Sequence, residues 1–149
     1  MTLATIPEGY HTVTPYLAVK NAGDVIGFLK SAFGAEEIER TELEDGRILN
    51  AEIKIGDSML MVAEAREGFE RPGTMYLYVP DTDEAYTQAL EAGATSIMEP
   101  ADQYYGDRNA GVEDMGGNQW WIATHFEDVS SDEMLRRAIS REEEHHTSK

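Results

Sequence analysis

Thr74–Val79 (TMYLYV) repeats the pattern of Thr14–Val19 (TPYLAV) sixty positions earlier in the chain. A second pair of similar segments, Gly56–Ala63 (GDSMLMVA) and Gly117–Thr124 (GNQWWIAT), is separated by sixty-one positions. Two units of nearly equal length therefore lie in tandem, and each begins and ends with a strand-like segment. Because ligands bind preferentially where such units meet, the repeat also indicates where to look for a site.

Composition limits the class of protein before any motif is considered. The chain has 149 residues, no cysteine and a formal net charge of −17. We expect a single domain over residues 1–149, with the size to bury about two thirds of its unfolded surface. The lack of cysteine excludes disulfides and thiolate metal ligands and is typical of a cytoplasmic protein. The acidic excess would repel nucleic acid and anionic membranes, and the sequence has no apolar run long enough to span a membrane. We therefore expect neither nucleic acid nor a membrane as a partner.

The first unit, residues 10–64, has the pattern of one helix among four strands. Val25, Ile26, Leu29 and Phe33 recur at helical spacing, and Gly34 follows them as a stop signal. Apolar residues then alternate with polar ones from Leu49 onward. The unit is predicted as βαβββ: strands at His11–Val19, Glu36–Leu43, Leu49–Ile55 and Ser58–Glu64, turns at Asp45-Gly46 and Gly56-Asp57, and Asn21 or Asp24 as the helix cap.

The second unit, residues 74–126, repeats this order after a charged linker at 65–73 that contains Pro72. We expect a strand at Thr74–Val79, a helix from the cap Asp81 or Thr82 to Ala92, a short strand near Ser96–Met98, a long loop to Asp107, a strand to Asp114, and a last strand at Asn118–His125. Residues 128–149 are predicted to form a C-terminal helix, over Asp128–Ile139, followed by a frayed polar tail.

Several short blocks in these units resemble the vicinal oxygen chelate superfamily, which includes glyoxalase I, extradiol dioxygenases and the bleomycin- and fosfomycin-resistance proteins. The blocks also look like the PhnB-like branch of that superfamily. The resemblance implies an α+β fold in which two tandem βαβββ modules form a curled, cup-shaped mixed sheet with helices on its convex face. The blocks are Pro15–Leu17, Ala32–Glu36, Ile55–Ser58, Pro100–Gln103, Tyr105–Arg108 and Ile122–His125.

Alternation along the strands predicts which side chains line the concave face of this cup, because successive residues of a strand point to opposite faces. The apolar set Leu49, Ala51, Ile53 and Ile55 is expected to meet the helix, which leaves Asn50 and Glu52 facing the cup. The same reasoning places Trp120 in the helix-packed core. The predicted lining of the cup is Thr12, Thr14, Tyr16, Asn50, Glu52, Leu60, Val62, Glu64, Thr74, Tyr76, Tyr78, Gln119, Trp121, Ala123 and His125.

The resemblance also implies four positions where metal-dependent members carry a ligand, usually histidine or glutamate. In this chain those positions are Thr14, Leu60, Thr74 and Trp121. Leucine and tryptophan offer no lone pair to a metal, and neutral threonine hydroxyls are poor ligands for transition metals. We therefore predict no metal and no other cofactor. An improvised site that combines Glu52 with His125 or Glu64 stays open as an alternative.

Each candidate residue has a functional and a structural interpretation. Glu52 is either a general base or counterion inside the cup, or the ion-pair partner of a neighbour such as Lys54 or Arg108. His125 can act in acid–base chemistry or simply be hydrogen-bonded. Tyr76, Tyr78 and Trp121 can stack on a flat ligand or pack within the barrel. Tyr105 and Arg108 belong to a loop that either fixes a ligand or is tied down by an Asp107–Arg108 pair.

Together these features predict a metal-independent protein that binds a small aromatic or cationic compound and forms a homodimer, as resistance proteins of this superfamily do. The alternative is a glyoxalase-like lyase or isomerase, or a dioxygenase, that uses a displaced metal or Glu52 as general base. A dimer whose cup is filled by its own side chains also stays open. The sequence leaves undecided whether modules pair within one chain or between two.

Overall fold

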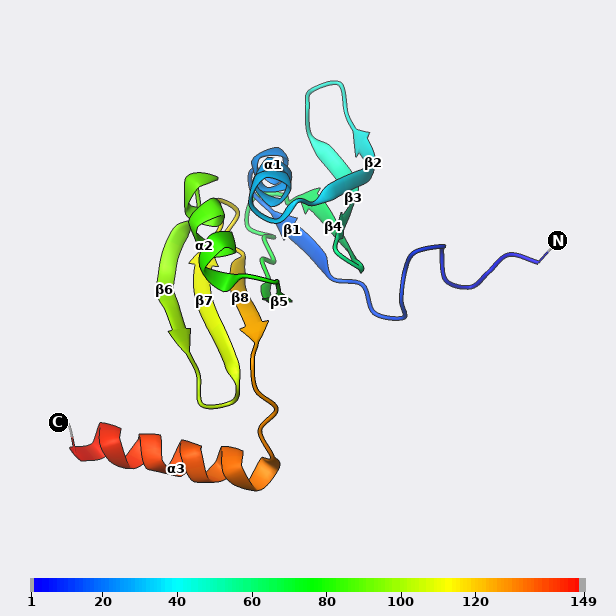
Figure 1. Ribbon diagram of the computed structural model, residues 1–149. Coiled ribbons are helices and arrows are strands. Elements are labelled where there is room, and N and C mark those ends of the chain that lie inside the picture. Colours follow the sequence, from blue (N-terminus) through cyan, green and yellow to red (C-terminus); the bar gives the residue numbers. More distant parts are fainter. Residues whose placement is uncertain (1, 148–149) are drawn as a thin grey trace.

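The computed structural model describes residues 2–147 and contains the βαβββ order twice, as predicted (Figure 1). The first module consists of β1 (Tyr16–Val19), α1 (Ala22–Phe33), β2 (Glu36–Glu42), β3 (Ile48–Ile55) and β4 (Ser58–Glu64). The second consists of β5 (Thr74–Tyr78), α2 (Thr82–Glu91), β6 (Thr95–Asp102), β7 (Asp107–Glu113) and β8 (Gln119–His125), and α3 (Ser131–Thr147) follows it. No helix within residues 2–147 is long and apolar enough to cross a membrane.

Each module forms its own four-stranded mixed sheet, and the two sheets do not close on each other. The strand orders are β1-β4-β3-β2 and β5-β8-β7-β6, so the two topologies are identical. In both, the first strand pairs in parallel with the last, and the other pairs are antiparallel. The parallel pair requires a crossover connection, which α1 and α2 provide.

Three predicted boundaries are wrong. The first strand begins at Tyr16 rather than at His11. β6 runs from Thr95 to Asp102, so the loop expected up to Asp107 shrinks to residues 103–106. The C-terminal helix begins at Ser131 and continues to Thr147, because its polar second half keeps helix-forming residues despite the absence of an apolar stripe. Residues 148 and 149 of the predicted tail lie outside the described part.

α1 begins in a way that the sequence did not indicate. Asn21 occupies the N-cap position with φ 60°, but its side chain makes no capping hydrogen bond. The carboxylate of Glu64, at the end of β4, instead accepts a hydrogen bond of 3.1 Å from the backbone N–H of Ala22. A carboxylate at the positive end of the helix dipole stabilises the first turn, so Glu64 links β4 to α1. α2 has the expected cap, with Asp81 accepting from the N–H of Glu84.

The register of β3 and β4 decides which residues face α1. Ala51 lies opposite Val62 and Ile53 lies opposite Leu60, and all four side chains are buried in the core. Since opposite residues of paired strands share a face, Leu60 and Val62 point toward the helix. Their predicted place beside Glu52 is therefore wrong. Glu52 lies opposite Met61 on the other face.

One further face assignment in β3 is wrong because of a bulge. Leu49 is predicted to meet the helix, yet it is 46% exposed whereas Ile48 is only 3% exposed. The pairing of β3 with β2 shifts at this point, since Thr41 lies opposite Asn50 but Glu42 lies opposite Ile48. The extra residue, Leu49, interrupts the alternation and brings Ile48 to the core.

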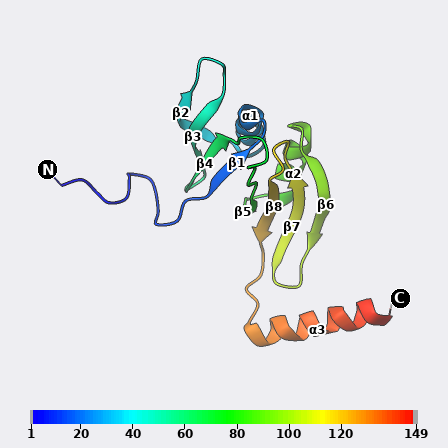
Figure 2. The same cartoon turned by 180° about the vertical axis from the view of Figure 1, so that it is seen from behind.

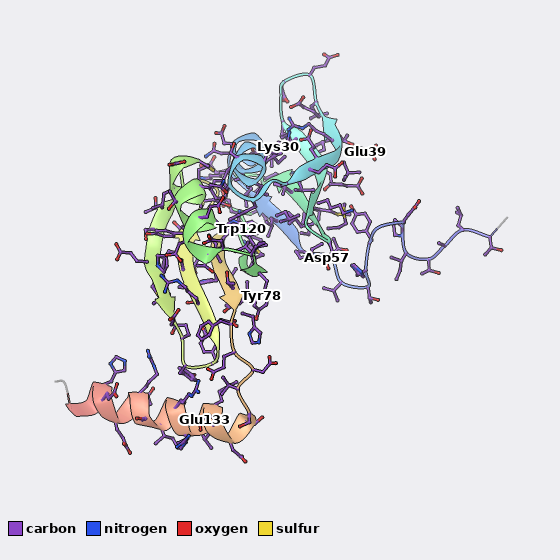
Figure 3. All side chains as sticks on the ribbon, viewed as in Figure 1. Lys30, Glu39, Asp57, Tyr78, Trp120 and Glu133 are labelled. Carbon is purple, nitrogen blue, oxygen red and sulfur yellow. The ribbon has the colours of Figure 1, made fainter. Side chains whose placement is uncertain are left out.

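The two modules share one hydrophobic core through their helices. α1 and α2 contact each other, and the ring of Phe33 at the end of α1 lies 5.4 Å from the ring of Trp120 on β8. Trp120 is 1% exposed, which confirms its predicted place in the core (Figure 3). Each sheet therefore turns its helix-packed face toward the other module and its second face, hereafter the helix-free face, away from it. α3 lies apart from both sheets, beyond the end of β8 (Figure 2).

A buried carboxylate fixes the turn between β7 and β8. Asp114 is almost fully buried and accepts hydrogen bonds from the backbone N–H groups of Gly116 and Asn118, from the amide of Asn118 and from the indole N–H of Trp120 at 2.8 Å. Asn118 in turn accepts from the backbone N–H of Gly73, just before β5. This network connects the core tryptophan to the parallel strand pair of the second module.

We expect Asp114→Ala to lower the free energy of unfolding by about 3 kcal/mol, because it leaves several buried donors without an acceptor. Urea unfolding followed by tryptophan fluorescence measures the change. Asp57→Ala is the matched control, since Asp57 is exposed in the corresponding turn of the first module. A loss for Asp114→Ala no larger than that of the control would contradict the role of this network.

Candidate functional site

The helix-free face of the second sheet holds four of the predicted site residues, Tyr76, Tyr78, Trp121 and His125. Tyr76 lies opposite Trp121 across the β5–β8 pair, and Tyr78 lies opposite Ala123. On the other side of β8, Asp107 lies opposite His125 and Asn109 lies opposite Ala123. Because β5, β7 and β8 are adjacent, these side chains form one continuous surface. The predicted common face of Tyr76, Tyr78, Trp121 and His125 is present.

Asp107 is the centre of this surface. It is almost fully buried and accepts hydrogen bonds from the hydroxyl of Tyr76 at 2.7 Å and the hydroxyl of Tyr78 at 3.0 Å. Nδ1 of His125 lies 2.7 Å from its other oxygen. Burial alone would raise the pKa of Asp107, but the hydrogen bonds from Tyr76, His125 and Tyr78 together place that pKa below its ordinary value. Asp107 therefore stays ionised and accepts only.

The two tyrosines are held as neutral donors by this carboxylate. Burial, together with the hydrogen bond to Asp107, raises the pKa of Tyr76, and the hydrogen bond to Asp107 raises the pKa of Tyr78. Their rings are in an edge-to-face arrangement with centroids 5.3 Å apart. Each phenol proton is directed at Asp107, so the ring faces and hydroxyl lone pairs are the groups left for other contacts.

Each ring nitrogen of His125 forms a hydrogen bond with a carboxylate. Nδ1 contacts Asp107, and Nε2 lies 2.6 Å from Asp128. Only the protonated imidazole has two N–H groups to donate. The hydrogen bonds to Asp128 and Asp107 raise the pKa of His125 above its ordinary value. These two hydrogen bonds contribute fully to the stability of the fold at a pH below the pKa that His125 has in the unfolded chain. The contribution is lost as the pH rises through the raised pKa of the folded state.

A second layer of polar groups continues the network toward the loop at 103–106. The amide nitrogen of Asn109 donates to the hydroxyl of Tyr105 at 2.6 Å and to that of Tyr76 at 3.2 Å. The carbonyl of the Asn109 side chain accepts from the amide of Gln103. Tyr105, a predicted site residue, is thus joined to the helix-free face through Asn109.

Trp121 is positioned by the glycine opposite it. A Cβ atom at Gly111 would lie 2.7 Å from the six-membered ring of Trp121, so the indole rests directly on the backbone of β7. The indole N–H donates to Gln119 at 3.3 Å. The bare backbone of Gly111 is what allows the ring to lie against the sheet and present its other face outward.

The helix-free face of the first sheet carries a different set of groups. Tyr16 lies opposite Met61, which lies opposite Glu52, which lies opposite Glu39. The hydroxyl of Tyr10, from the segment before β1, donates to Glu52 at 2.5 Å. Burial and the hydrogen bond to Glu52 raise the pKa of Tyr10 to about 12. This face is therefore acidic with aromatic neighbours.

The structure does not bring all predicted residues together. Tyr16, Asn50 and Glu52 lie on the first sheet, and Tyr76, Tyr78, Tyr105, Trp121 and His125 lie on or beside the second. The Oδ1 atom of Asn50 is buried without a hydrogen-bond partner. Leu60 and Val62 face α1.

Arg108 also lies on the helix side of its sheet, where it binds Asp83 at 2.8 Å and Asp102 at 3.1 Å. The predicted Asp107–Arg108 pair is wrong, because neighbours in a strand point to opposite faces. Arg108 is likewise not the partner of Glu52. Asp107 and Asn109 are functional candidates that the sequence reasoning missed, although alternation along β7 from Asp107 would place both beside His125 and Trp121.

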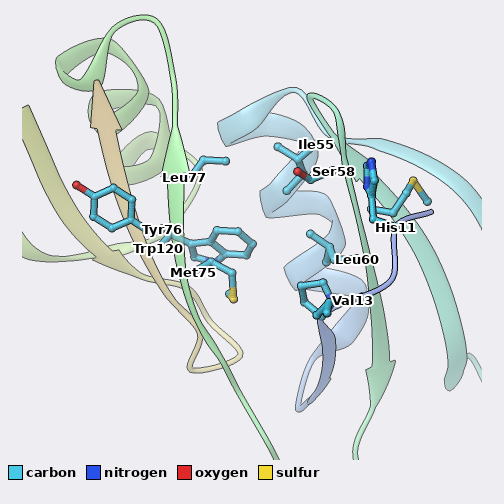
Figure 4. Close-up of a pocket in the computed structure, with 11 residues that line it drawn as sticks. His11, Val13, Ile55, Ser58, Leu60, Met75, Tyr76, Leu77 and Trp120 are labelled. Atoms are coloured by element: carbon cyan, nitrogen blue, oxygen red, sulfur yellow. The ribbon is translucent and has the colours of Figure 1, made fainter. Parts of the chain in front are cut away.

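A separate cleft of about 240 Å³ lies between the helix-packed faces (Figure 4). Trp120 and Leu77 point into it from the second sheet, whereas the ring of Tyr76 points away from it. Its volume is below the roughly 300–1,000 Å³ of typical small-molecule sites, and its lining is mainly apolar. The lining residues are His11, Val13, Pro15, Ile55, Ser58, Met59, Leu60, Met75, Tyr76, Leu77 and Trp120. The helix-free faces hold the ionisable and hydrogen-bonding groups.

Within residues 2–147, no three histidine, aspartate or glutamate side chains come together as a potential metal site. The chemistry that the two faces offer is aromatic stacking, hydrogen bonding through phenols and amides, and contact with the charged groups Glu39, Glu52 and His125.

Comparison with known proteins extends these observations. A protein of uncharacterised function from Mycobacterium bovis is 31% identical over 134 residues, which cover 82% of this chain and 88% of that protein. The crystal structure of TioX from Micromonospora sp. ML1 superposes with a TM-score of 0.66 at 23% identity, over 78% of this chain and 99% of TioX.

TnmS3, an antibiotic binding protein from Streptomyces sp. CB03234, superposes with a TM-score of 0.62 at 16% identity, over 83% of this chain and 99% of TnmS3. These two likenesses establish a common fold. The sequence model of one family matches residues 10–122, which include both βαβββ modules except the end of β8. The chain therefore belongs to the Glyoxalase/Bleomycin resistance protein/Dioxygenase superfamily.

Proposed function

We propose that this protein binds a small aromatic or cationic compound, without a metal, in a cup that two copies of the chain build together. The observation that carries the proposal is the surface of Tyr76, Tyr78 and Trp121 around the buried Asp107. It is built like a binding wall, but Tyr76 and Tyr78 stay 45% and 62% exposed, so no opposite wall covers them within residues 2–147. TnmS3, which shares the fold, is an antibiotic binding protein. Sequestration of such a compound is the corresponding role here.

The arrangement of the modules supports a cup formed between two copies. The helix-packed faces of the two sheets look toward each other across the cleft at Leu60 and Trp120, so the helix-free faces look in opposite directions. Tyr16 is 56% exposed and Tyr78 is 62% exposed in the single chain. Exposed aromatic surface of this kind marks interfaces and ligand sites. In a homodimer, the first sheet of one copy covers the second sheet of its partner.

Electrostatics favour a cationic group on the ligand. The net charge of −17 attracts cations at long range. Within the cup, Glu39 and Glu52 lie side by side on the wall formed by the first sheet. Two adjacent carboxylates repel each other, and a bound cation reduces that repulsion.

The residues at the superfamily's four metal positions do not fit a divalent metal. Leu60 is turned into the core and Trp121 lies flat on Gly111, and neither offers a lone pair. Only the hydroxyls of Thr14 and Thr74 remain, and these are weak ligands. We therefore propose a metal-independent mode of binding. Membership of the PhnB-like branch and a cytoplasmic location are part of the same proposal, the latter because the chain has no cysteine.

A second candidate function is an enzyme that uses Glu52 as general base. The observation in its favour is the 2.5 Å hydrogen bond from Tyr10, which orients the Glu52 carboxylate on the helix-free face. A lyase or isomerase reaction requires such a positioned proton acceptor. Against it, the hydroxyl of Tyr10 already occupies one oxygen of this carboxylate.

Trp121→Ala should weaken binding of 2-naphthylmethylammonium about tenfold, because the indole supplies the flat face on which the naphthyl ring stacks. Isothermal titration calorimetry on the dialysed protein, with and without a chelator, measures the affinity. Phe69→Ala, which removes an exposed aromatic ring in the linker, should leave it unchanged. Equal losses in the two variants, or binding that disappears with the chelator, would overturn the proposal.

Glu52→Gln distinguishes the two candidate functions. For a binding protein, we expect the affinity for 2-naphthylmethylammonium to fall about fivefold at low ionic strength and less in high salt, with no change for neutral 2-naphthylmethanol. For an enzyme, turnover would vanish while both affinities stayed nearly constant. If Glu52→Gln leaves the affinity for the cation unchanged, the acidic residues of the first sheet do not take part in binding.

A further inference from the structure

The two carboxylates that bind His125 differ sharply in how firmly they are held. The side chain of Asp107 is 4% exposed and has two further hydrogen bonds, from Tyr76 and Tyr78. The side chain of Asp128 is fully exposed. Among the described residues, its hydrogen-bond partner is Nε2 of His125 alone. Asp107 is therefore a fixed partner of the imidazole, and Asp128 is a replaceable one.

The weak partner occupies the nitrogen that faces outward. Nδ1 is directed into the network at Asp107, so Nε2 is the only position of the ring from which another molecule can accept a hydrogen bond. His125 is the last residue of β8 and shares the helix-free face with Tyr78 and Trp121. Tyr78 and His125 share Asp107 as hydrogen-bond partner, so the imidazole adjoins the Tyr78 end of the aromatic wall.

Other charged groups near this position are already neutralised. Glu127, two residues beyond His125, binds Arg137 at 2.8 Å, and Arg137 also contacts Glu133 and the backbone carbonyl of Tyr104. Among the described residues, Asp107 and Asp128 are the carboxylates bonded to His125. Exposed ion pairs contribute little to stability, so displacing Asp128 costs little.

We propose that Nε2 of His125 is the anchor for an anionic group on the ligand, and that Asp128 occupies this anchor until the ligand replaces it. The inference rests on the proposed function and specifies its ligand class: an aromatic compound with an acidic group such as a carboxylate. With Glu39 and Glu52 on the opposite wall of a two-copy cup, a ligand carrying both an acidic and a basic group on an aromatic body matches both walls.

The test compares naphthalene-2-carboxylate with neutral 2-naphthylmethanol by isothermal titration calorimetry on the full chain. Asp128→Ala should bind the carboxylate about threefold more tightly, because the internal competitor is gone. His125→Gln should bind it about tenfold more weakly, because a charge-assisted hydrogen bond is lost. Asp132→Ala, which removes the same charge from the first turn of α3, is the matched control and should have no effect.

Binding of 2-naphthylmethanol should be equal in all four proteins, and this comparison also establishes that the variants are folded. If it binds equally but Asp128→Ala leaves the affinity for the carboxylate unchanged or weaker, the anchor is wrong and the proposed function stands. If Asp132→Ala tightens binding as much as Asp128→Ala, the effect is one of net charge and the anchor is again wrong. If neither naphthyl compound binds any of the proteins although 2-naphthylmethylammonium does, the anchor is wrong and the proposed function stands. If none of the three compounds binds, the proposed function fails and this inference with it.

Discussion

Helices α1 and α2 pack against each other, and the remaining architecture follows from that contact. Each sheet buries one face on its own helix, and α1 and α2 join both buried faces into one core through contacts such as Phe33 with Trp120. A strand exposes alternate side chains on its two faces, so the groups that do not serve the core must point outward, in opposite directions for the two modules. The helix-free faces of the two sheets thus point away from each other within one copy, and the proposed dimer is the arrangement that would bring them together as two halves of one site.

Within the second half-site, Asp107 sets the orientation of its neighbours. A buried carboxylate is costly unless donors satisfy it, and here Tyr76, Tyr78 and His125 supply them. The requirement works in both directions: the donors keep Asp107 ionised, and Asp107 fixes the tyrosine rings and one nitrogen of the imidazole. A rigid aromatic wall loses little conformational entropy when a ligand stacks on it. In the proposed cup, the acidic wall of the first sheet, with Glu39 opposite Glu52, would supply complementary charge rather than rigidity.

Repetition and alternation were enough to predict the βαβββ order and the common face of Tyr76, Tyr78, Trp121 and His125. They also predicted a helix from the cap Asp81 or Thr82 to Ala92, which the structure contains as α2, Thr82–Glu91. They were not enough for Leu60 and Val62, because the face of β4 depends on its register with β3, and a strand of continuous apolar residues does not indicate which side is inside. Leu49 was misplaced by a bulge that no local pattern marks. Asp107 was overlooked because its sequence neighbour Arg108 suggested an ion pair, whereas its true partner His125 is adjacent only through the β7–β8 pairing.

Subunit complementation tests the central claim most directly. One chain carries Tyr16→Ala and Glu52→Gln on its first sheet, and another carries Trp121→Ala and Tyr78→Ala on its second; each alone should fail to bind 2-naphthylmethylammonium. If the cup forms between copies, unfolding and refolding the two together should restore about a quarter of the wild-type number of sites, because half of randomly assorted dimers are mixed and each mixed dimer holds one intact cup. If no binding returns although mixed dimers form, the two walls do not come from different chains and the account is contradicted.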